Sequence, residues 1–269
     1  MRLDDAGGFV FDVDGTLVRR APDGVEPMPG AVDVLTAIRD SGRPLMLFTN
    51  GSHVPPEVFA AGLRRDGLPV EEHEVMTPVC SALSYLARRH PDASVFLFST
   101  EATRERMAGA GVRLVEGEDA ETADVVFVAH TDVADLPEME RAARAILRGA
   151  RLLTASYLPA YAGADGPIFS RGAMLTAAVV KATGARPTIV GKPSRAAARE
   201  VSERLGVPSV DLVVTGDDVR MDVGLGLTGG SRTILVRSGI TGDMDLSRLP
   251  ERRRPHAVVD GVRELLAWL

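Results

Sequence analysis

Two aspartates, one residue apart, stand in the stretch Phe9-Val10-Phe11-Asp12-Val13-Asp14-Gly15-Thr16-Leu17, where an apolar run meets a glycine turn. Residues 10–13 have the composition of a short buried strand, and side chains alternate along a strand. Asp12 and Asp14 therefore leave the predicted strand on one face at its carboxyl end. Two carboxylates so near each other repel, and they need a cation or a shared proton to reduce the repulsion. An Asp-Gly pair is also ordinary turn chemistry, so this stretch alone leaves a catalytic and a structural interpretation open.

The composition is that of an ordinary globular protein with a net negative charge. The chain has 269 residues, of which 45% are hydrophobic and 25% are charged, and its formal net charge is -6. This length allows one large domain or two modest ones. Proteins that bind phosphate backbones normally carry clustered Lys and Arg, so we expect neither nucleic acid nor an anionic membrane as the main partner.

Cysteine usage and the first residues of the chain favour the cytoplasm. Cys80 is the only cysteine, so no intramolecular disulfide can form and a reducing compartment is expected. Acidic residues stand where a signal peptide has basic ones, and no apolar run approaches the ~20 residues of a membrane span. We therefore expect a cytoplasmic protein that is neither exported nor embedded in a membrane.

Apolar runs of the strand type alternate with helical patterns through most of the chain. The order is strand, helix, strand, helix over residues 10–67, and a similar alternation returns over residues 188–236. This order is typical of a parallel sheet covered by helices. The stretch between them has strands and helices of its own and is domain-sized. We predict an α/β fold with a core made of residues 1–77 and 185–269 and an inserted domain over residues 78–184.

Polar residues follow four of the predicted strands. Ligands of an open parallel sheet bind beyond the carboxyl ends of its strands, so each of these residues is a candidate for a site. A turn, a surface lysine or a helix cap would explain each segment singly, but their joint placement favours a divalent cation and a phosphate, because Mg²⁺ prefers one or two carboxylates with water and phosphate oxygens. The four segments are Asp12-Val13-Asp14-Gly15-Thr16, Thr49-Asn50-Gly51-Ser52, Gly191-Lys192-Pro193, and Gly216-Asp217-Asp218 with Asp222.

In this order, the four segments resemble the motifs of the haloacid dehalogenase (HAD) superfamily, subfamily IIA, the 4-nitrophenylphosphatase-like phosphatases. The resemblance covers nearly the whole chain, since Met28-Pro29-Gly30-Ala31 and the large insertion between the second and third motifs also fit. It implies a Rossmann-like parallel-sheet core with an inserted α/β cap domain of type 2. It also implies an enzyme, a phosphoric monoester hydrolase that uses Mg²⁺.

The resemblance further assigns the acidic residues. Asp12 would be the nucleophile that forms an aspartyl-phosphate, and Asp14 would be the acid and then the base. Asp12, the backbone carbonyl of Asp14, and Asp217 would hold Mg²⁺. Asp218 or Asp222 would act on the metal through water or through hydrogen bonds to its ligands.

The phosphate-binding residues follow from the same resemblance. Thr49 and the backbone amides of Asn50 and Gly51 would bind the transferring phosphoryl group. Lys192 would neutralise that group while restraining Asp12.

The inserted domain departs from the pattern of the subfamily. Many relatives carry a Thr-Asn-x-Asp segment after a cap strand, whereas this chain reads Thr154-Ala155-Ser156-Tyr157. The rings of Tyr157 and Tyr161 would either stack on a substrate or pack against the protein. The resemblance also implies a homodimer built through the cap.

The leading prediction is a Mg²⁺-dependent phosphatase that hydrolyses a small phosphorylated metabolite: a sugar phosphate, phosphoglycolate, a nucleotide or pyridoxal phosphate. A phosphomutase or phosphotransferase would use the same intermediate and differ in the acceptor. A two-component receiver domain is disfavoured by the large insertion and by a motif order that ends in acids instead of lysine. A catalytically silent binder of phosphorylated ligands is opposed by the intact pair Asp12 and Asp14.

Overall fold

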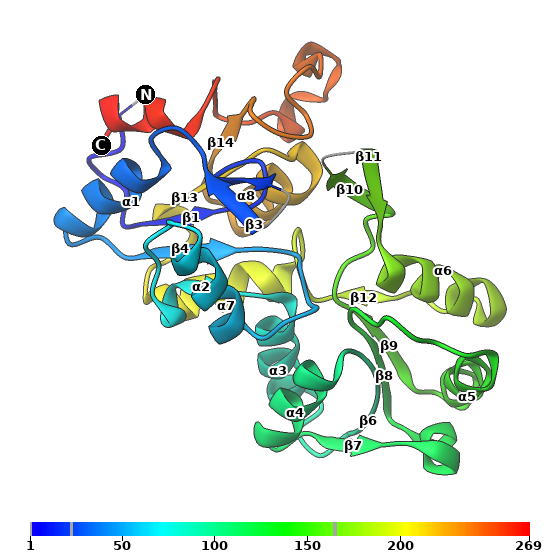
Figure 1. Cartoon of the computed structure of the whole chain (residues 1–269). Coiled ribbons are helices and arrows are strands. Elements are labelled where there is room, and N and C mark those ends of the chain that lie inside the picture. The colour runs from blue at the N-terminus through cyan, green and yellow to red at the C-terminus, as the bar shows by residue number, and fades with distance from the viewer. Residues whose placement is uncertain (1, 22–23, 164–165) are drawn as a thin grey trace.

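Two parallel sheets, each in its own lobe, organise the chain (Figure 1). The fold comes from a computed structural model, which describes residues 2–21, 24–163 and 166–269. One sheet is made from both ends of the chain, and the other lies between them in sequence. The predicted α/β class with parallel sheets is confirmed.

The first sheet has six strands in the order β15-β14-β13-β1-β4-β5. Strand β1 is central and pairs with β13 on one side and β4 on the other, so the ends of these three strands lie side by side. All four residues of β1 are buried, as expected of a sheet covered by helices on both faces. The strands are β1 (Gly8–Phe11), β4 (Leu45–Phe48), β5 (Val75–Met76), β13 (Leu212–Gly216), β14 (Arg232–Val236) and β15 (Ala257–Val259).

Helices cover both faces of the first sheet. Apolar side chains alternate along β1, so each face offers an apolar surface for helices to pack on. Phe9 and Phe11 pack on one face with residues of α1, α2 and η7, whereas Val10 packs on the other with residues of α7 and α8. A π-helical turn, η4, leads into α8. These elements are α1 (Ala31–Asp40), α2 (Pro56–Arg65), α7 (Arg195–Leu205), η4 (Val219–Val223), α8 (Gly224–Gly229) and η7 (Val262–Ala267).

The second sheet has five strands in the order β12-β9-β8-β6-β7. Its two faces carry separate apolar clusters, one shared with α3 and α4 and the other with α5 and α6. The strands are β6 (Ser94–Phe98), β7 (Arg113–Val115), β8 (Val125–Val128), β9 (Arg151–Thr154) and β12 (Thr188–Ile189). The helices are α3 (Pro78–Arg89), α4 (Glu101–Gly109), α5 (Leu136–Leu147), α6 (Arg171–Thr183) and the short η2 (Gly117–Thr122).

One strand joins a different sheet from the one that the sequence predicts. The pattern places residues 188–190 in the first sheet, but β12 pairs with β9 in the second, with Thr188 opposite Leu153 and Ile189 opposite Thr154. A strand of two residues has no periodicity that would select its partner, and strand pairing is a long-range choice. Lys192 therefore approaches from the edge of the second sheet. The domain limits at 77/78 and 184/185 themselves stay a prediction.

Two antiparallel hairpins, which the sequence pattern did not reveal, stand outside the large sheets. Strands β2 and β3 form one, and the amide of Val25 in β3 donates to Asp66 Oδ2 at 3.2 Å. Strands β10 and β11 form the other. The hairpin strands are β2 (Val18–Ala21), β3 (Gly24–Pro27), β10 (Ala160–Gly163) and β11 (Gly166–Phe169). Short 3₁₀ segments complete the described chain: η1 (Glu72–Glu74), η3 (Ser209–Asp211), η5 (Leu246–Arg248) and η6 (Glu251–Arg253).

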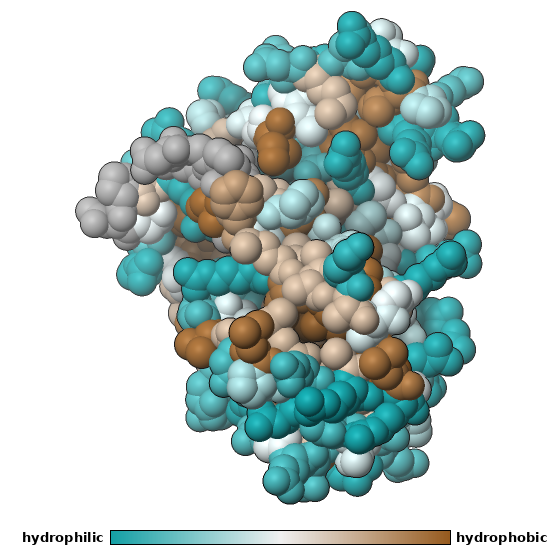
Figure 2. Space-filling view, turned by 90° about the vertical axis from the view of Figure 1, so that its right-hand side faces the viewer, coloured by the Kyte–Doolittle hydropathy of each residue, from teal (hydrophilic) through white to brown (hydrophobic). Residues whose placement is uncertain are grey.

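Exposed apolar side chains gather on the side of the molecule shown in Figure 2, across the middle of that face and between more hydrophilic ends. In the second lobe, large exposed apolar residues include Val133, Leu136, Phe169 and Met174. The homodimer through this lobe stays a prediction. Among the described helices, none has the length and apolarity that crossing a membrane requires.

The central strand supplies a test of the core. Phe11 is fully buried one residue before Asp12, so Phe11→Ala removes a large side chain that the surrounding atoms cannot fully replace. We expect the free energy of unfolding in urea to fall by about 3–5 kcal/mol. Val32→Ala, at an exposed position of α1, is the control and should change it by less than about 0.5 kcal/mol. Equal effects of the two substitutions would contradict the described packing.

Candidate active site

A cleft of ≈ 360 Å³ lies where the strand ends of the first sheet face the second lobe. Residues of the second lobe, among them His130 and Ser156, line it as well. The structure brings all four predicted segments to this cleft, although Asp12 and Asp222 are 210 positions apart in the sequence. The predicted residues that line it are Asp12, Asp14, Thr49, Asn50, Gly51, Lys192, Asp217, Asp218 and Asp222.

Three carboxylates form a tight cluster at the cleft. One carboxylate oxygen from each of Asp12, Asp217 and Asp222 lies within 4.8 Å of those of the other two. The pairing of β1 with β13 produces this arrangement, because it sets Phe11 opposite Thr215, and the Asp12 amide donates to the Thr215 carbonyl at 2.9 Å. Asp217 and Asp222 are only 6% and 2% exposed.

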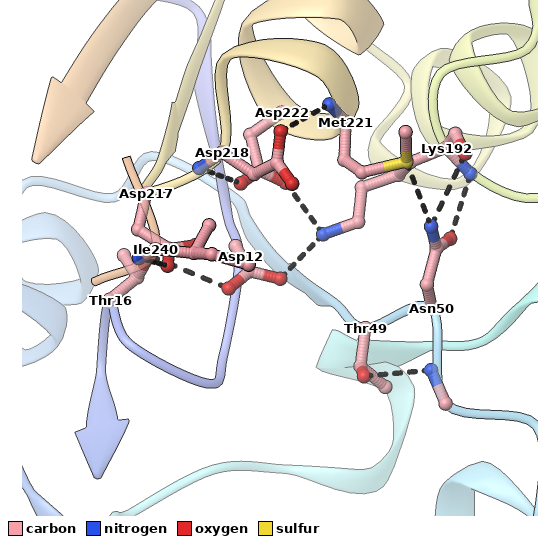
Figure 3. Close-up of polar contacts among 11 residues, drawn as sticks. Asp12, Thr16, Thr49, Asn50, Lys192, Asp217, Asp218, Met221, Asp222 and Ile240 are labelled. Atoms are coloured by element: carbon pink, nitrogen blue, oxygen red, sulfur yellow. Dashed lines mark hydrogen bonds and ion pairs between the residues drawn. The ribbon is translucent and has the colours of Figure 1, made fainter. Parts of the chain in front are cut away.

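The ammonium of Lys192 lies between two of these carboxylates. Its Nζ donates to Asp12 Oδ1 at 2.5 Å and to Asp222 Oδ1 at 2.7 Å (Figure 3). Burial lowers the pKa of Lys192, but the charges of Asp12 and Asp222 outweigh that cost and raise the pKa above its ordinary value. Lys192 therefore stays charged and balances part of the negative charge of the cluster.

Asn50 fastens the Lys192 segment to the end of β4. The Lys192 amide donates to Asn50 Oδ1 at 2.9 Å, and Asn50 Nδ2 donates to the Lys192 carbonyl at 3.2 Å (Figure 3). Gly191 must be glycine here, because a Cβ would lie 2.3 Å from the Ala155 carbonyl oxygen and 2.7 Å from Asn50 Oδ1. The sequence predicted a role for the backbone amide of Asn50, but not the hydrogen bonds of its side chain to the Lys192 backbone.

Thr49 and Gly51 form the wall of the cleft beside Asn50. Thr49 is 5% exposed, and its Oγ1 accepts a hydrogen bond from the Gly51 amide at 3.0 Å. Both residues line the cleft. Their predicted contacts with a phosphoryl group stay a prediction.

A loop after β14 holds Asp217 in place. The Ile240 amide donates to Asp217 Oδ2 at 2.7 Å, and the Thr241 hydroxyl donates to the Asp217 carbonyl. Neither Gly15 nor Gly239 leaves room for a side chain, since a Cβ would lie 2.6 Å and 1.9 Å from Asp217 Oδ2. The sequence analysis did not identify this loop, although Gly239, shortly after β14, was a usable signal.

Asp218, in contrast, has a structural position. Its Oδ1 accepts hydrogen bonds from the amides of Arg220 at 2.6 Å and Met221 at 3.1 Å, and so it caps the helical turn η4. Its own amide donates to Asp222 Oδ2 at 3.0 Å, which orients that carboxylate. The helix-cap interpretation holds for Asp218, whereas its neighbour Asp217 belongs to the cluster.

The electrostatics of the cluster fit a divalent cation. Burial raises the pKa of Asp12 well above its ordinary value, and Asp222 and Asp217 add to the rise against the opposing charge of Lys192. Burial raises the pKa of Asp217 to about 7, again with a contribution from Asp222. Two buried carboxylates and the largely buried Asp12 share one ammonium, so the site carries more negative charge than its protein partners neutralise. Oxygen donors of this kind are the ligands that Mg²⁺ prefers.

The outer part of the cleft contains basic residues that sequence analysis missed. Arg20 Nε lies 3.3 Å from Asp14 Oδ1, and His53 and His130 line the cleft nearby. No sequence signal marked them, because their positions depend on how a hairpin and two loops approach one another. Tyr157 is 38% exposed and is absent from the described lining of the cleft, and the side chain of Tyr161 lies outside the described residues.

Comparisons with known proteins indicate one superfamily. A family model described as haloacid dehalogenase-like hydrolase matches residues 9–113, and one described as HAD-hydrolase-like matches residues 189–265. The ribonucleotide monophosphatase NagD of Escherichia coli (strain K12) is 28% identical over 256 residues, which cover 95% of this chain and 96% of that protein.

Solved structures of phosphatases match the whole fold. The p-nitrophenyl phosphatase from Archaeoglobus fulgidus superposes with a TM-score of 0.86 and 28% identity, covering 98% of this chain and 100% of that one. The glycerol phosphate phosphatase from Mycobacterium tuberculosis, solved in complex with magnesium, gives a TM-score of 0.87 and 26% identity, covering 98% of this chain and 78% of that one.

A two-lobed α/β fold with carboxylates gathered at its strand ends is that of a HAD-type hydrolase, and the chain belongs to the haloacid dehalogenase superfamily. Within it, the relatives are 4-nitrophenylphosphatase-like members of subfamily IIA. The protein is therefore an enzyme, a phosphatase acting on small phosphorylated substrates.

The raised pKa of Asp217 predicts a pH-dependent stability without metal. Its folded-state value of about 7 lies above the ordinary 3.8, so the folded state binds more protons between these values and its stability falls as pH rises through them. In EDTA, Asp217→Asn should gain on the order of 2 kcal/mol relative to wild type between pH 5 and 8. Urea unfolding measures this gain. Asp260→Asn, at an exposed position, is the control, and a pH-independent difference for Asp217→Asn would contradict the assignment.

Proposed function

We propose that the protein hydrolyses a small phosphomonoester in a Mg²⁺-dependent reaction, through an aspartyl-phosphate on Asp12. The observation that supports this most directly is the position of Asp12, which lies in the carboxylate cluster at the cleft and 2.5 Å from Lys192 Nζ. A nucleophilic carboxylate needs a restrained direction and compensated charge, and Lys192 supplies both.

The first step transfers the phosphoryl group to Asp12. One Asp12 oxygen forms a bond to phosphorus while the bond from phosphorus to the leaving oxygen breaks, and Asp14 gives a proton to that oxygen. Lys192 holds Asp12 Oδ1, which fixes the plane of the carboxylate during attack. Asp14 suits the proton transfer because it lines the cleft and is not part of the buried cluster.

The second step restores the enzyme. Asp14 accepts a proton from a water molecule, whose oxygen bonds to phosphorus while the bond from phosphorus to Asp12 breaks. Inorganic phosphate leaves, and both aspartates return to their first state. Thr49 and the amides of Asn50 and Gly51 would orient the phosphoryl oxygens in both steps, since they form one wall of the cleft.

The metal ligands in this proposal are Asp12, the backbone carbonyl of Asp14, and Asp217, with Asp222 adjoining them in the same carboxylate cluster. Bound Mg²⁺ would supply positive charge that stabilises the oxygens of the transferring phosphoryl group. Asp218 supports this arrangement through its amide, which orients the Asp222 carboxylate.

The same intermediate would serve a phosphomutase or a phosphotransferase, which differ in the group that accepts the phosphoryl. No contact in the described residues favours either one. The phosphatases reported above are named for different substrates, so none of their substrates is carried over. Analysis of the products with an acceptor alcohol present separates hydrolysis from transfer, since hydrolysis releases all of the phosphorus as inorganic phosphate, whereas transfer forms a new phosphomonoester of the acceptor.

Removing the proposed nucleophile tests the mechanism. Asp12→Asn should lower the rate of 4-nitrophenyl phosphate hydrolysis with Mg²⁺ by about 10³-fold or more, because the amide cannot form the acyl phosphate. Release of 4-nitrophenolate is followed at 405 nm. Asp33→Asn, an exposed position of α1, is the control and should keep the wild-type rate. Thermal unfolding confirms that each variant is folded, and equal rates for Asp12→Asn and wild type would refute the mechanism.

Removing the proposed base separates the two steps. With 4-nitrophenyl phosphate the leaving group needs little protonation, so Asp14→Asn should still form the aspartyl-phosphate but hydrolyse it slowly. We expect an initial burst of 4-nitrophenolate close to one equivalent per active site. Intact-protein mass spectrometry should then detect one added phosphoryl group, and peptide mapping should place it on Asp12. An Asp14→Asn variant with neither burst nor added mass would show that Asp14 does not act as the base.

A further inference from the structure

The end of the cleft away from the carboxylate cluster is basic. Arg20, His53 and His130 line this outer end. The acidic residues in the described lining belong to two segments, residues 12–14 and 217–222, of which Asp12, Asp217 and Asp222 form the cluster and Asp14 faces Arg20. The cleft therefore has an acidic inner end, balanced in part by Lys192, and a basic outer end that the reaction at Asp12 does not use.

The organic part of the substrate has to reach this outer end. In the proposed reaction Asp14 protonates the leaving oxygen, so the group attached to that oxygen lies beside Asp14. Arg20 Nε is 3.3 Å from Asp14 Oδ1, which brings the Arg20 guanidinium within reach of the same group. Arg20 comes from the β2–β3 hairpin, lines the cleft, and has a side chain that remains 43% exposed.

Two histidines from different lobes complete the basic end. His53 follows β4 and His130 follows β8, and their ring centroids lie 5.7 Å apart with an interplanar angle of 62°. His130 Nε2 is 3.3 Å from Asp132 Oδ1. Asp132 also pairs with Arg171, so its charge is divided between two basic partners.

His53 is partly buried and lies close to two other basic side chains. Burial lowers the pKa of His53, and the nearby His130 and Arg20 lower it further, while Asp14 and Asp132 oppose them. Within the described part of the chain, the His53 ring has no hydrogen-bond partner. A negative group placed among Arg20, His53 and His130 would be attracted to all three.

We propose that Arg20, His53 and His130 bind a second anionic group on the organic part of the substrate, either a carboxylate or a second phosphate. This inference rests on the proposed function and assigns it a substrate class: small phosphomonoesters that carry a further anion. The cleft volume of ≈ 360 Å³ holds a phosphoryl group and a short organic part. The selectivity arises at the cleft mouth, where the hairpin and both lobes contribute one side chain each.

Matched substrate pairs test the inference on the full chain with Mg²⁺. 3-Phosphoglycerate and glycerol 3-phosphate differ by a carboxylate in place of a hydroxymethyl group. Fructose 1,6-bisphosphate and fructose 6-phosphate differ by a second phosphate. The anionic member of at least one pair should have a kcat/KM higher by about tenfold or more, chiefly through a lower KM, because charge-assisted hydrogen bonds form in the bound substrate. The pair that responds identifies the source of the anion.

Variants then assign the preference to the named side chains. Arg20→Gln and His130→Gln should each reduce the ratio of kcat/KM between the anionic and neutral members by about tenfold, and Arg20→Lys should restore part of it. His73→Gln, at an exposed position of η1 that is absent from the described lining of the cleft, is the control and should keep the wild-type ratio. The ratio separates recognition of the anion from a general loss of activity.

Equal kcat/KM within each pair would overturn the inference, as would a preference that survives both Arg20→Gln and His130→Gln. Either result leaves the proposed phosphatase reaction standing, because 4-nitrophenyl phosphate would still be hydrolysed with Mg²⁺ and not after Asp12→Asn. If 4-nitrophenyl phosphate is not hydrolysed at all, the proposed function fails and the inference fails with it.

Discussion

The buried contact of the Lys192 ammonium with Asp12 and Asp222 is the interaction on which the site depends. Carboxylates that leave water for a protein interior are costly unless opposite charges and hydrogen bonds compensate them. Lys192 supplies charge, Ile240 supplies an amide, and Asn50 fixes the Lys192 backbone. Lys192 lies in the connection between β12 of the second sheet and α7 on the first, so the charge balance of the site depends on a segment that joins the two lobes.

The neighbouring acids Asp217 and Asp218 have different roles because their side chains turn in different directions. Asp217 turns into the carboxylate cluster, whereas Asp218 turns back to cap the π-helical segment that follows it. That segment carries Asp222 back toward the strand end, where its carboxyl carbon would lie 2.2 Å from a Cβ at Gly216. Only glycine at position 216 leaves room for the Asp222 carboxylate in this position. Sequence spacing alone does not distinguish these three aspartates.

The sequence predicted much of the fold, because apolar periodicity is a local property and the strands and helices of both sheets follow it. It placed the strand before Lys192 in the wrong sheet, because pairing partners depend on the whole chain. At the site, residue types at strand ends identified Asp12 and Asp217, which the structure brings together. The hydrogen bond of the Asn50 side chain to Lys192 and the basic group around Arg20 depend on contacts between segments far apart in the sequence. No local sequence pattern predicts such contacts.

Three glycines lie directly against the carboxylates of the site. At Gly15, Gly216 and Gly239 a single methyl group would occupy the volume that carboxylate atoms of Asp217 or Asp222 already fill. These three uncharged positions thus define the space of the anionic centre as firmly as the acids themselves do. A survey of natural variation in this enzyme that scored only ionisable residues would overlook the places where the smallest change of volume displaces a carboxylate.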